Sequence, residues 1–333
     1  MAGRAYQTNR DPGSGINWFP LPAGWTEFSH IPNPTYPTTS GFEAATFQSG
    51  NKIVISFAGT EPTSLNDWLA NAGLATSIGS VQLVQAADYY LKIRQANSDP
   101  NVTITFTGHS LGGGLAALLG VFFNQQAVTF DQAPFANSAN AVMRDFLVSN
   151  LLVLQDANQQ PLYTSQQLMS LAPALFTSNF NPTNLANSNV TTLRVVGEFT
   201  SSLFPVSSFS PLGPQTPLLH GPTDISMFDL HAQSLLAAFV QNDQFRQVTF
   251  NLTDLLGMIF DSNLYKKDTA LTKENFLERL VRHQNGNAPG VTTADAMLTR
   301  FTDDLWKLAQ NGGLTMTDNI PGGIFSSPPN NVS

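Results

Sequence analysis

The stretch that decides the fold is TFTGHSLGGGLAALLG, residues 105–120. It overlaps the short, β-branched, apolar run VTITF (102–106), which predicts a buried strand, and it leads into an apolar run over 111–124 that predicts a helix. Ser110 lies at the joint, and Gly108 and Gly112 flank it in the pattern G-x-S-x-G. In a nucleophile elbow the serine occupies such a sharp strand-to-helix turn, where a Cβ on either flank would clash.

A helix that begins directly after the serine also predicts a site for negative charge. The first backbone N–H groups of a helix have no partner inside the helix and favour a developing oxyanion, so the N–H of Leu111 is the first candidate donor. Two other glycine-rich loops fit less well. A P-loop requires a lysine after its last glycine, and none follows here; the glycine spacing also departs from the dinucleotide fingerprint.

The rest of the chain predicts an α/β fold. GFEAATF (41–47) and KIVISF (52–57) are typical of a hairpin. Residues 81–97 show helical periodicity, and the strand-like runs at 127–131 and 191–197 add to a mostly parallel sheet flanked by helices. Residues 1–40 are interpreted as an irregular lead-in, 201–224 as a long loop and 230–241 as a helix. We predict a domain over 1–249 with a cap-like helical insertion at about 136–190, and a helical C-terminal extension over 250–333 packed on it.

Composition excludes several classes of function. Among 333 residues the formal net charge is −8 and only 11% are charged, and we see no basic patch, which argues against nucleic acid as a partner. The absence of cysteine excludes disulfides, thiolate nucleophiles and cysteine-based metal sites. No 18-residue apolar run predicts a transmembrane segment, and the first 19 residues show no signal-peptide pattern. We therefore expect a cytoplasmic protein or one secreted by a leaderless route.

The segment PNVTITFTGHSLGGGLAALLG resembles the nucleophile region of the class 3, fungal-type lipases of the α/β-hydrolase superfamily. Upstream, NKIVISFAGTEPTSLNDWLANAG (51–73) is similar to the family's strand-turn segment, with Ala58 where the family usually has arginine and Asp67-Trp68 downstream. The resemblance is good over 41–135 and fades towards 240. It implies an α/β-hydrolase fold, ester hydrolysis without metal or organic cofactor, and a backbone role for Thr60 as the second oxyanion donor.

A serine nucleophile needs a histidine base, which the superfamily places after the serine and after the acid in the chain. The family's histidine sits on a late loop beside a C-terminal helix, so we predict His231 as the base, with His220 as the alternative. His283 is expected at the surface. His109, the x of the motif, is expected to pack rather than to catalyse.

The third member is a carboxylate that orients the histidine. The segment TLRVVGEF resembles the family strand that leads into the acid, and the loop after it carries Glu198 where the family usually has aspartate. We predict Glu198, while Asp224, Asp229 and Asp131 remain competitors.

These residues predict a serine carboxylic-ester hydrolase of the lipase type. Its substrates would be acylglycerols or other lipid esters, presented at a lipid–water interface. The alternatives are a phospholipase A-type esterase, and a catalytically inactive hydrolase-fold binding module of a larger surface or secreted protein.

Overall fold

The computed structural model describes residues 1–6, 21–32, 41–59, 77–200, 210–221, 223–250 and 255–259. Its contacts divide the chain into two compact units. Unit 1 comprises residues 1–9, 23–194 and 203–216, and unit 2 comprises residues 10–22, 195–202 and 217–333. Most of the predicted C-terminal extension lies outside the described residues, so the boundary at 249/250 stays a prediction.

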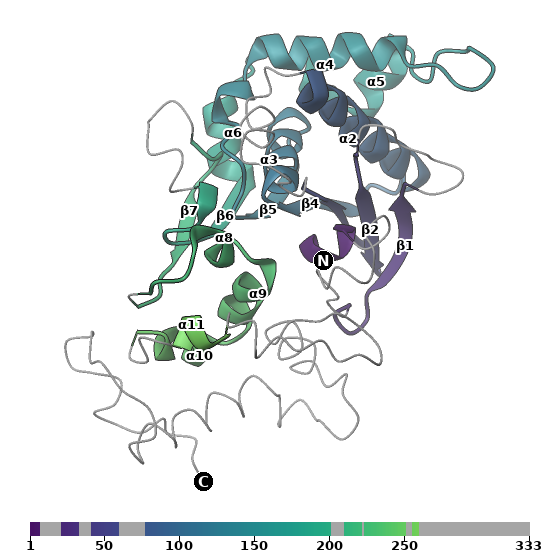
Figure 1. Ribbon diagram of the computed structural model, residues 1–333. Coiled ribbons are helices and arrows are strands. Elements are labelled where there is room, and N and C mark those ends of the chain that lie inside the picture. The colour runs from purple at the N-terminus through teal and green to yellow at the C-terminus, as the bar shows by residue number, and fades with distance from the viewer. Residues whose placement is uncertain are drawn as a thin grey trace, which may run out of the picture. The chain divides into compact units, whose positions relative to one another are not determined.

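A seven-stranded sheet runs through the fold in the spatial order β1-β2-β3-β4-β5-β6-β7, the same order as in the chain (Figure 1). Its strands are β1 (Thr26–Ile31), β2 (Ala44–Ser49), β3 (Lys52–Phe57), β4 (Thr103–His109), β5 (Gln126–Phe130), β6 (Val190–Val195) and β7 (Gln215–Leu218). The first three strands pair antiparallel, whereas β3 to β6 are parallel to one another. The predicted hairpin and the predicted mostly parallel sheet are both confirmed.

The register of the two central strands positions the site. Strands β3 and β4 pair in parallel from Lys52 opposite Thr103 to Phe57 opposite Gly108. Because parallel strands bring their carboxyl ends to one edge of the sheet, the turn after β3 lies beside the turn after β4.

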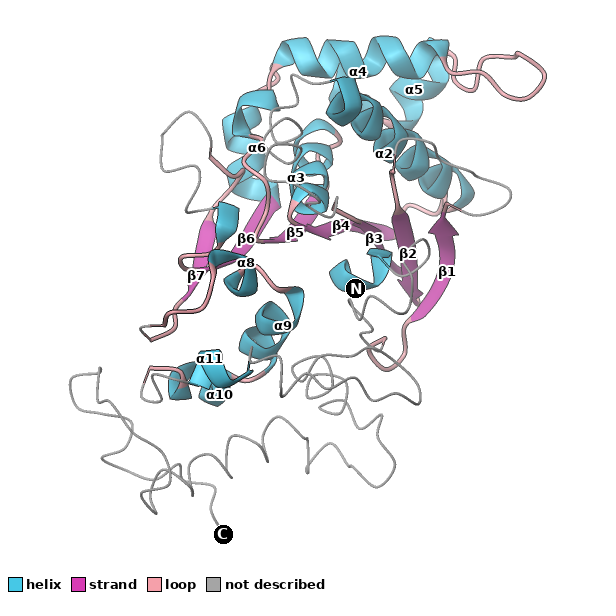
Figure 2. Cartoon of the chain, in the orientation of Figure 1, coloured by secondary structure: helices cyan, strands magenta, loops and turns pink. Residues whose placement is uncertain are grey.

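The connections between the parallel strands carry helices on one face of the sheet (Figure 2). Successive strands are added in one direction, and right-handed crossovers then place their helices on the same side. These helices are α2 (Ser77–Ala96), α3 (Leu111–Phe122), α4 (Ala141–Val153), α5 (Ser165–Leu171) and α6 (Pro182–Asn189), with 3-10 turns η3 (Ala136–Ser138) and η4 (Pro173–Phe176). On the opposite face the 3-10 helix η1 (Ala2–Tyr6) packs against β3 and β4.

Helix α3 forms the centre of unit 1. All of its residues are buried, as expected for a helix that is apolar on every side. Its glycines allow close packing: a Cβ on Gly114 would overlap the ring of Phe135, and one on Gly113 would lie 3.0 Å from the Cβ of Gln132. The helix behind Ser110 is therefore surrounded by the core.

In its described residues, unit 2 contains the short helices α8 (Met227–Leu230), α9 (Gln233–Gln241), α10 (Asp243–Val248) and α11 (Leu255–Ile259). None of the helices in the described part of the chain is both long and apolar enough to span a bilayer.

Two expectations about local structure were wrong. The lead-in over 1–40 contains η1 and β1, and the expected loop at 201–224 contains β7. Strand β7 forms because the Pro214 carbonyl before it accepts a hydrogen bond from the Thr192 N–H of β6, a contact between distant segments. The expected helix at 230–241 is confirmed as α9, which begins three residues later, at Gln233; the separate short helix α8, capped by Ser226, ends at Leu230. Residues 136–190 form α4 to α6, and their action as a cap or lid stays a prediction.

Candidate active site

Ser110 occupies the predicted joint between β4 and α3, in a strained backbone conformation. Its φ of 56° and ψ of −126° lie in a region that L-residues rarely adopt, at a cost of about 1–3 kcal/mol. The surroundings hold this conformation in place. The Ser110 N–H donates to the Phe130 carbonyl at 3.1 Å, and the Ser110 carbonyl accepts from the N–H groups of Ala133 at 2.9 Å and Gly114 at 3.1 Å. The sequence prediction of a strand-turn-helix at this serine is confirmed.

The two glycines of the motif are required by close backbone approach. A Cβ at Gly108 would overlap the backbone of Gly112, the second residue of α3. A Cβ at Gly112 would overlap the carbonyl oxygen of Phe57 at the end of β3. The helix can therefore approach both strand ends only if both positions lack a side chain, as the motif predicted.

Leu111 is the first residue of α3, so its N–H belongs to the helix terminus at which negative charge is favoured. The predicted second donor, Thr60, lies outside the described residues, as does Asp67-Trp68. Its neighbour Gly59 is described, and a Cβ there would lie 3.2 Å from the Leu111 nitrogen. The turn after β3 thus approaches the elbow next to the predicted oxyanion donor of α3.

Glu198 and His231 form a hydrogen-bonded pair within unit 2. Glu198 follows β6 and is fully buried, and its Oε2 lies 2.7 Å from His231 Nδ1, 33 residues further along the chain. Because a carboxylate can only accept, Nδ1 carries the proton, and this leaves Nε2 as the basic nitrogen of the neutral ring. The edge of the imidazole packs on Phe199 with ring centroids 5.8 Å apart. The ring is therefore fixed both in orientation and in tautomer.

Thr200 completes the environment of this carboxylate, and the sequence reasoning missed it. Its N–H donates to Glu198 Oε2 at 2.6 Å, and its hydroxyl donates to Oε1 at 2.5 Å. Burial would raise the pKa of Glu198, but the hydrogen bond and charge of His231, together with the two bonds from Thr200, hold that pKa below its ordinary value. The only sequence signal was a hydroxyl residue two positions after the acid, which is too common to be diagnostic.

The competing residues have other partners. Both ring nitrogens of His220 lie on backbone carbonyls, of Gly221 at 2.6 Å and Val196 at 2.8 Å. Asp229 accepts from the Ser226 hydroxyl at 2.8 Å within the cap of α8.

The other two carboxylates and the remaining histidines are placed as follows. Asp131 is buried directly after β5, and its N–H donates to the Leu193 carbonyl. Asp224 lies in the described loop before α8, whereas the carboxylate bonded to His231 Nδ1 is that of Glu198. His109 is buried at the end of β4, and His283 lies outside the described residues. The structure thus brings Ser110 and Leu111 together in unit 1, and Glu198 and His231 together in unit 2. The catalytic roles of all four residues stay predictions.

Sequence comparisons give relatives for the N-terminal part of the chain. Residues 4–149, which include the elbow, match a family model described as phospholipase-like, a Tle-like phospholipase domain. An extracellular phospholipase A1 of Serratia liquefaciens is 32% identical over 133 residues, which is 40% of this chain and 40% of that protein. The N-terminal part of the chain is thus similar to lipase-like phospholipases.

This lipase-like chain is also similar to solved lipase structures. Lip2 lipase of Yarrowia lipolytica aligns with a TM-score of 0.38 and 16% identity, over 68% of this chain and 78% of that one. Rhizomucor miehei lipase aligns with a TM-score of 0.33 and 14% identity, over 58% and 57%. The chain spans less than half the length of the Serratia relative that it matches.

Proposed function

We propose that this chain is a serine hydrolase that cleaves carboxylic esters of lipids, with acylglycerols as its main substrates. One observation carries the proposal: Ser110 sits at φ 56° on a strand-to-helix turn, where Gly108 and Gly112 alone permit the approach of the helix. Evolution retains such strain where a side chain has to be presented for chemistry.

In the proposed reaction Ser110 attacks the ester carbonyl while His231 Nε2 takes its proton. Glu198 holds the imidazole through Nδ1 and stabilises the imidazolium that forms. The N–H groups of Leu111 and Thr60 bind the oxyanion, each contributing about 3–4 kcal/mol by analogy with other oxyanion holes. His231 then protonates the leaving alcohol. In the second half of the reaction a water molecule attacks the acyl-enzyme, His231 takes a proton from that water, and the proton passes to Ser110 as the acid is released.

A phospholipid ester is the second candidate substrate. The matching family model is described as a phospholipase domain, and the Serratia relative is named a phospholipase A1. The scissile bond in such a substrate is still a carboxylic ester, so the proposed chemistry of Ser110 needs no change. A vesicle assay separates the two: release of lysophospholipid from phosphatidylcholine identifies a phospholipase A, and release of fatty acid from trioleoylglycerol identifies a lipase.

The direct test is turnover of p-nitrophenyl butyrate by the wild-type chain and by Ser110→Ala. Loss of a true triad nucleophile lowers kcat by roughly 10⁴–10⁶-fold. Ser149→Ala is the matched control, because the Ser149 hydroxyl only bonds its own helix, at the Asp145 carbonyl. Equal rates for Ser110→Ala and wild type would contradict the proposal and favour an inactive binding module.

Secretion is a further part of the proposal. The Serratia relative carries the word extracellular in its name, and the acidic, cysteine-free composition is compatible with leaderless export. Esterase activity that appears in the medium of intact cells, while a cytoplasmic marker does not, would support it; activity retained in the cells would contradict it.

A further inference from the structure

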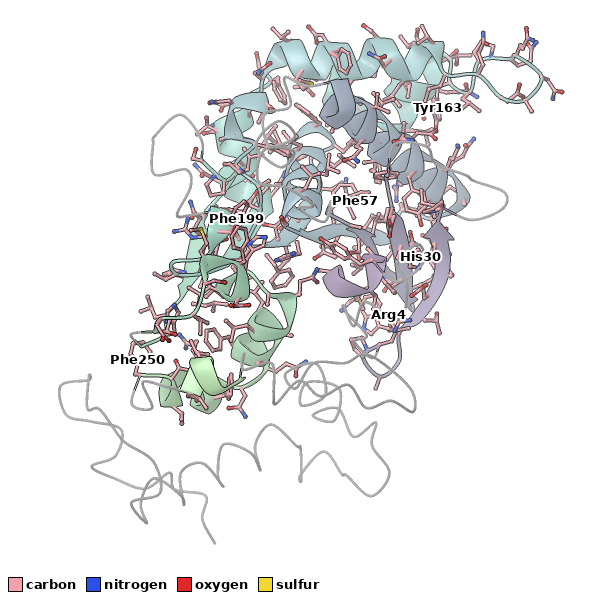
Figure 3. The ribbon with its side chains drawn as sticks, in the orientation of Figure 1. Arg4, His30, Phe57, Tyr163, Phe199 and Phe250 are labelled. Carbon is pink, nitrogen blue, oxygen red and sulfur yellow. The ribbon has the colours of Figure 1, made fainter. Side chains whose placement is uncertain are left out.

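The N-terminal 3-10 helix η1 is fastened to unit 1 by polar contacts near its start and end. Arg4 Nε donates to Glu27 Oε2 at 3.2 Å, and His30, which also bonds Glu27, contacts the Ala5 carbonyl through Nε2 at 3.2 Å. Figure 3 shows Arg4 and His30 close to one another beside this segment. Ala5 and Tyr6 are buried on the sheet. The segment is therefore held firmly enough to position another group.

The group that it presents to the candidate site is the hydroxyl of Tyr6. This oxygen accepts a hydrogen bond from the Gly59 N–H at 2.7 Å and donates one to the His109 carbonyl at 3.2 Å. Gly59 follows β3, and His109 immediately precedes the nucleophile. A hydroxyl can donate and accept at once, so Tyr6 bridges the two turns, using both of its capacities. The bridge is buried, since Tyr6 is only 5% exposed.

The space around Gly59 shows how closely this bridge sets the geometry. A Cβ on Gly59 would lie 2.6 Å from the Tyr6 hydroxyl, 3.0 Å from the His109 carbonyl and 3.2 Å from the Leu111 nitrogen. The turn at Gly59 therefore lies against both the Tyr6 hydroxyl and the elbow, next to the predicted oxyanion donor Leu111. A change in the length of the bridge would move Gly59 relative to Leu111.

We propose that Tyr6 is a positioning residue: its hydroxyl ties Gly59 to the elbow and sets the distance between the turn after β3 and the N-terminus of α3. The inference rests on the proposed function, because this distance matters for catalysis only if an oxyanion forms there. Oxyanion donors act at 2.7–3.1 Å from the developing charge, and displacement by about 1 Å costs roughly 10²-fold in rate.

The test compares Tyr6→Phe with Tyr163→Phe, in p-nitrophenyl butyrate turnover by the full chain. Tyr163 is a matched control: it is also buried in unit 1, and its hydroxyl donates to Asp88 Oδ1 at 2.7 Å, between α2 and the segment before α5. For Tyr6→Phe we expect kcat to fall by about 10- to 100-fold with KM changed less than threefold. For Tyr163→Phe we expect kcat within twofold of wild type.

Hydrogen exchange provides a readout that does not depend on activity. In Tyr6→Phe the Gly59 amide loses its acceptor, so its exchange should accelerate by at least tenfold, while the Thr107 amide inside β4 stays protected. Gly59→Ala places a Cβ against the Tyr6 hydroxyl and so disturbs the same hydrogen bond. It should also lower kcat.

The possible results distinguish a failure of the positioning role of Tyr6 from a failure of the proposed function. A kcat of Tyr6→Phe equal to that of Tyr163→Phe, in a chain whose Ser110→Ala variant is inactive, overturns the positioning role but leaves the proposed function intact. Unchanged exchange at Gly59 overturns the bridge itself. If Ser110→Ala is as active as wild type, the proposed function fails and the positioning role fails with it.

Discussion

Replacing Thr200 by valine removes one charge-assisted hydrogen bond from a buried carboxylate. The Thr200 hydroxyl lies 2.5 Å from Glu198 Oε1, and the Thr200 N–H and His231 remain as donors to Oε2. Valine has nearly the same shape as threonine, so the substitution leaves the backbone and the N–H bond in place.

The expected magnitude follows from the charge and the burial of the acceptor. A hydrogen bond to a charged group contributes about 1.5–3 kcal/mol, and Glu198 has no water to replace the lost donor because it is fully buried. Losing this donor also raises the pKa of Glu198 in the folded chain, because the hydroxyl bonds the charged form of the carboxyl group.

The sign of the pH dependence follows from the lowered pKa. In the wild type the folded pKa of Glu198 lies below that of the unfolded chain, so its contribution to stability is present above the unfolded pKa of about 4.3 and is lost as pH falls through the folded pKa. The variant has a higher folded pKa and hence a smaller contribution. The difference in unfolding free energy should therefore be full at pH 7 and shrink below about pH 4.

The assay is urea unfolding at pH 7 and at pH 3.5, with Thr192→Val as the control. Thr192 is also buried, but among the described residues its hydroxyl bonds neutral groups, the Thr129 hydroxyl, the Gln132 amide and the Leu212 carbonyl, so its loss should be independent of pH. A Thr200→Val variant as stable as wild type at pH 7, or one whose loss is the same at both pH values, would refute the reasoning.

Three further predictions concern the elbow and the acid–base pair. Gly112→Ala places a Cβ on the Phe57 carbonyl and should lower the unfolding free energy by about 1–3 kcal/mol in urea titration; full stability would contradict the packing argument. Glu198→Gln should keep the fold but lower kcat roughly 10⁴-fold, because an amide can stabilise the wrong tautomer of His231; ester turnover checks this, and a loss below tenfold would assign the acid elsewhere. His231→Ala should be as inactive as the serine variant in the same assay, whereas His220→Ala should keep kcat within about threefold, and the reverse order would exchange their roles.

The sequence by itself predicted the elbow, because the patterns that indicate its strand, turn and helix are local, although contacts with Phe57 and Phe130 of other strands hold it. Strand, turn and helix follow one another within about 20 residues. The two glycines of the motif indicate where a Cβ would overlap the backbone, at Gly112 for Gly108 and at Phe57 for Gly112. The alternation of strand-like and helical runs along the chain also predicted the parallel sheet and the position of Leu111 at a helix terminus. The sequence also named Glu198 and His231, but by resemblance and chain order, with Asp224, Asp229 and His220 left open.

Only the tertiary structure paired Glu198 with His231, because the 32 residues between them include β7 and α8, which no local pattern predicted. Thr200 emerged in the same way, since the backbone path of one loop decides whether its hydroxyl reaches the acid. Tyr6 shows the limit most clearly: its hydroxyl joins residues 53 and 103 positions away. Hydrogen bonds of that span depend on how β3, β4 and η1 pack, and packing is a property of the whole unit.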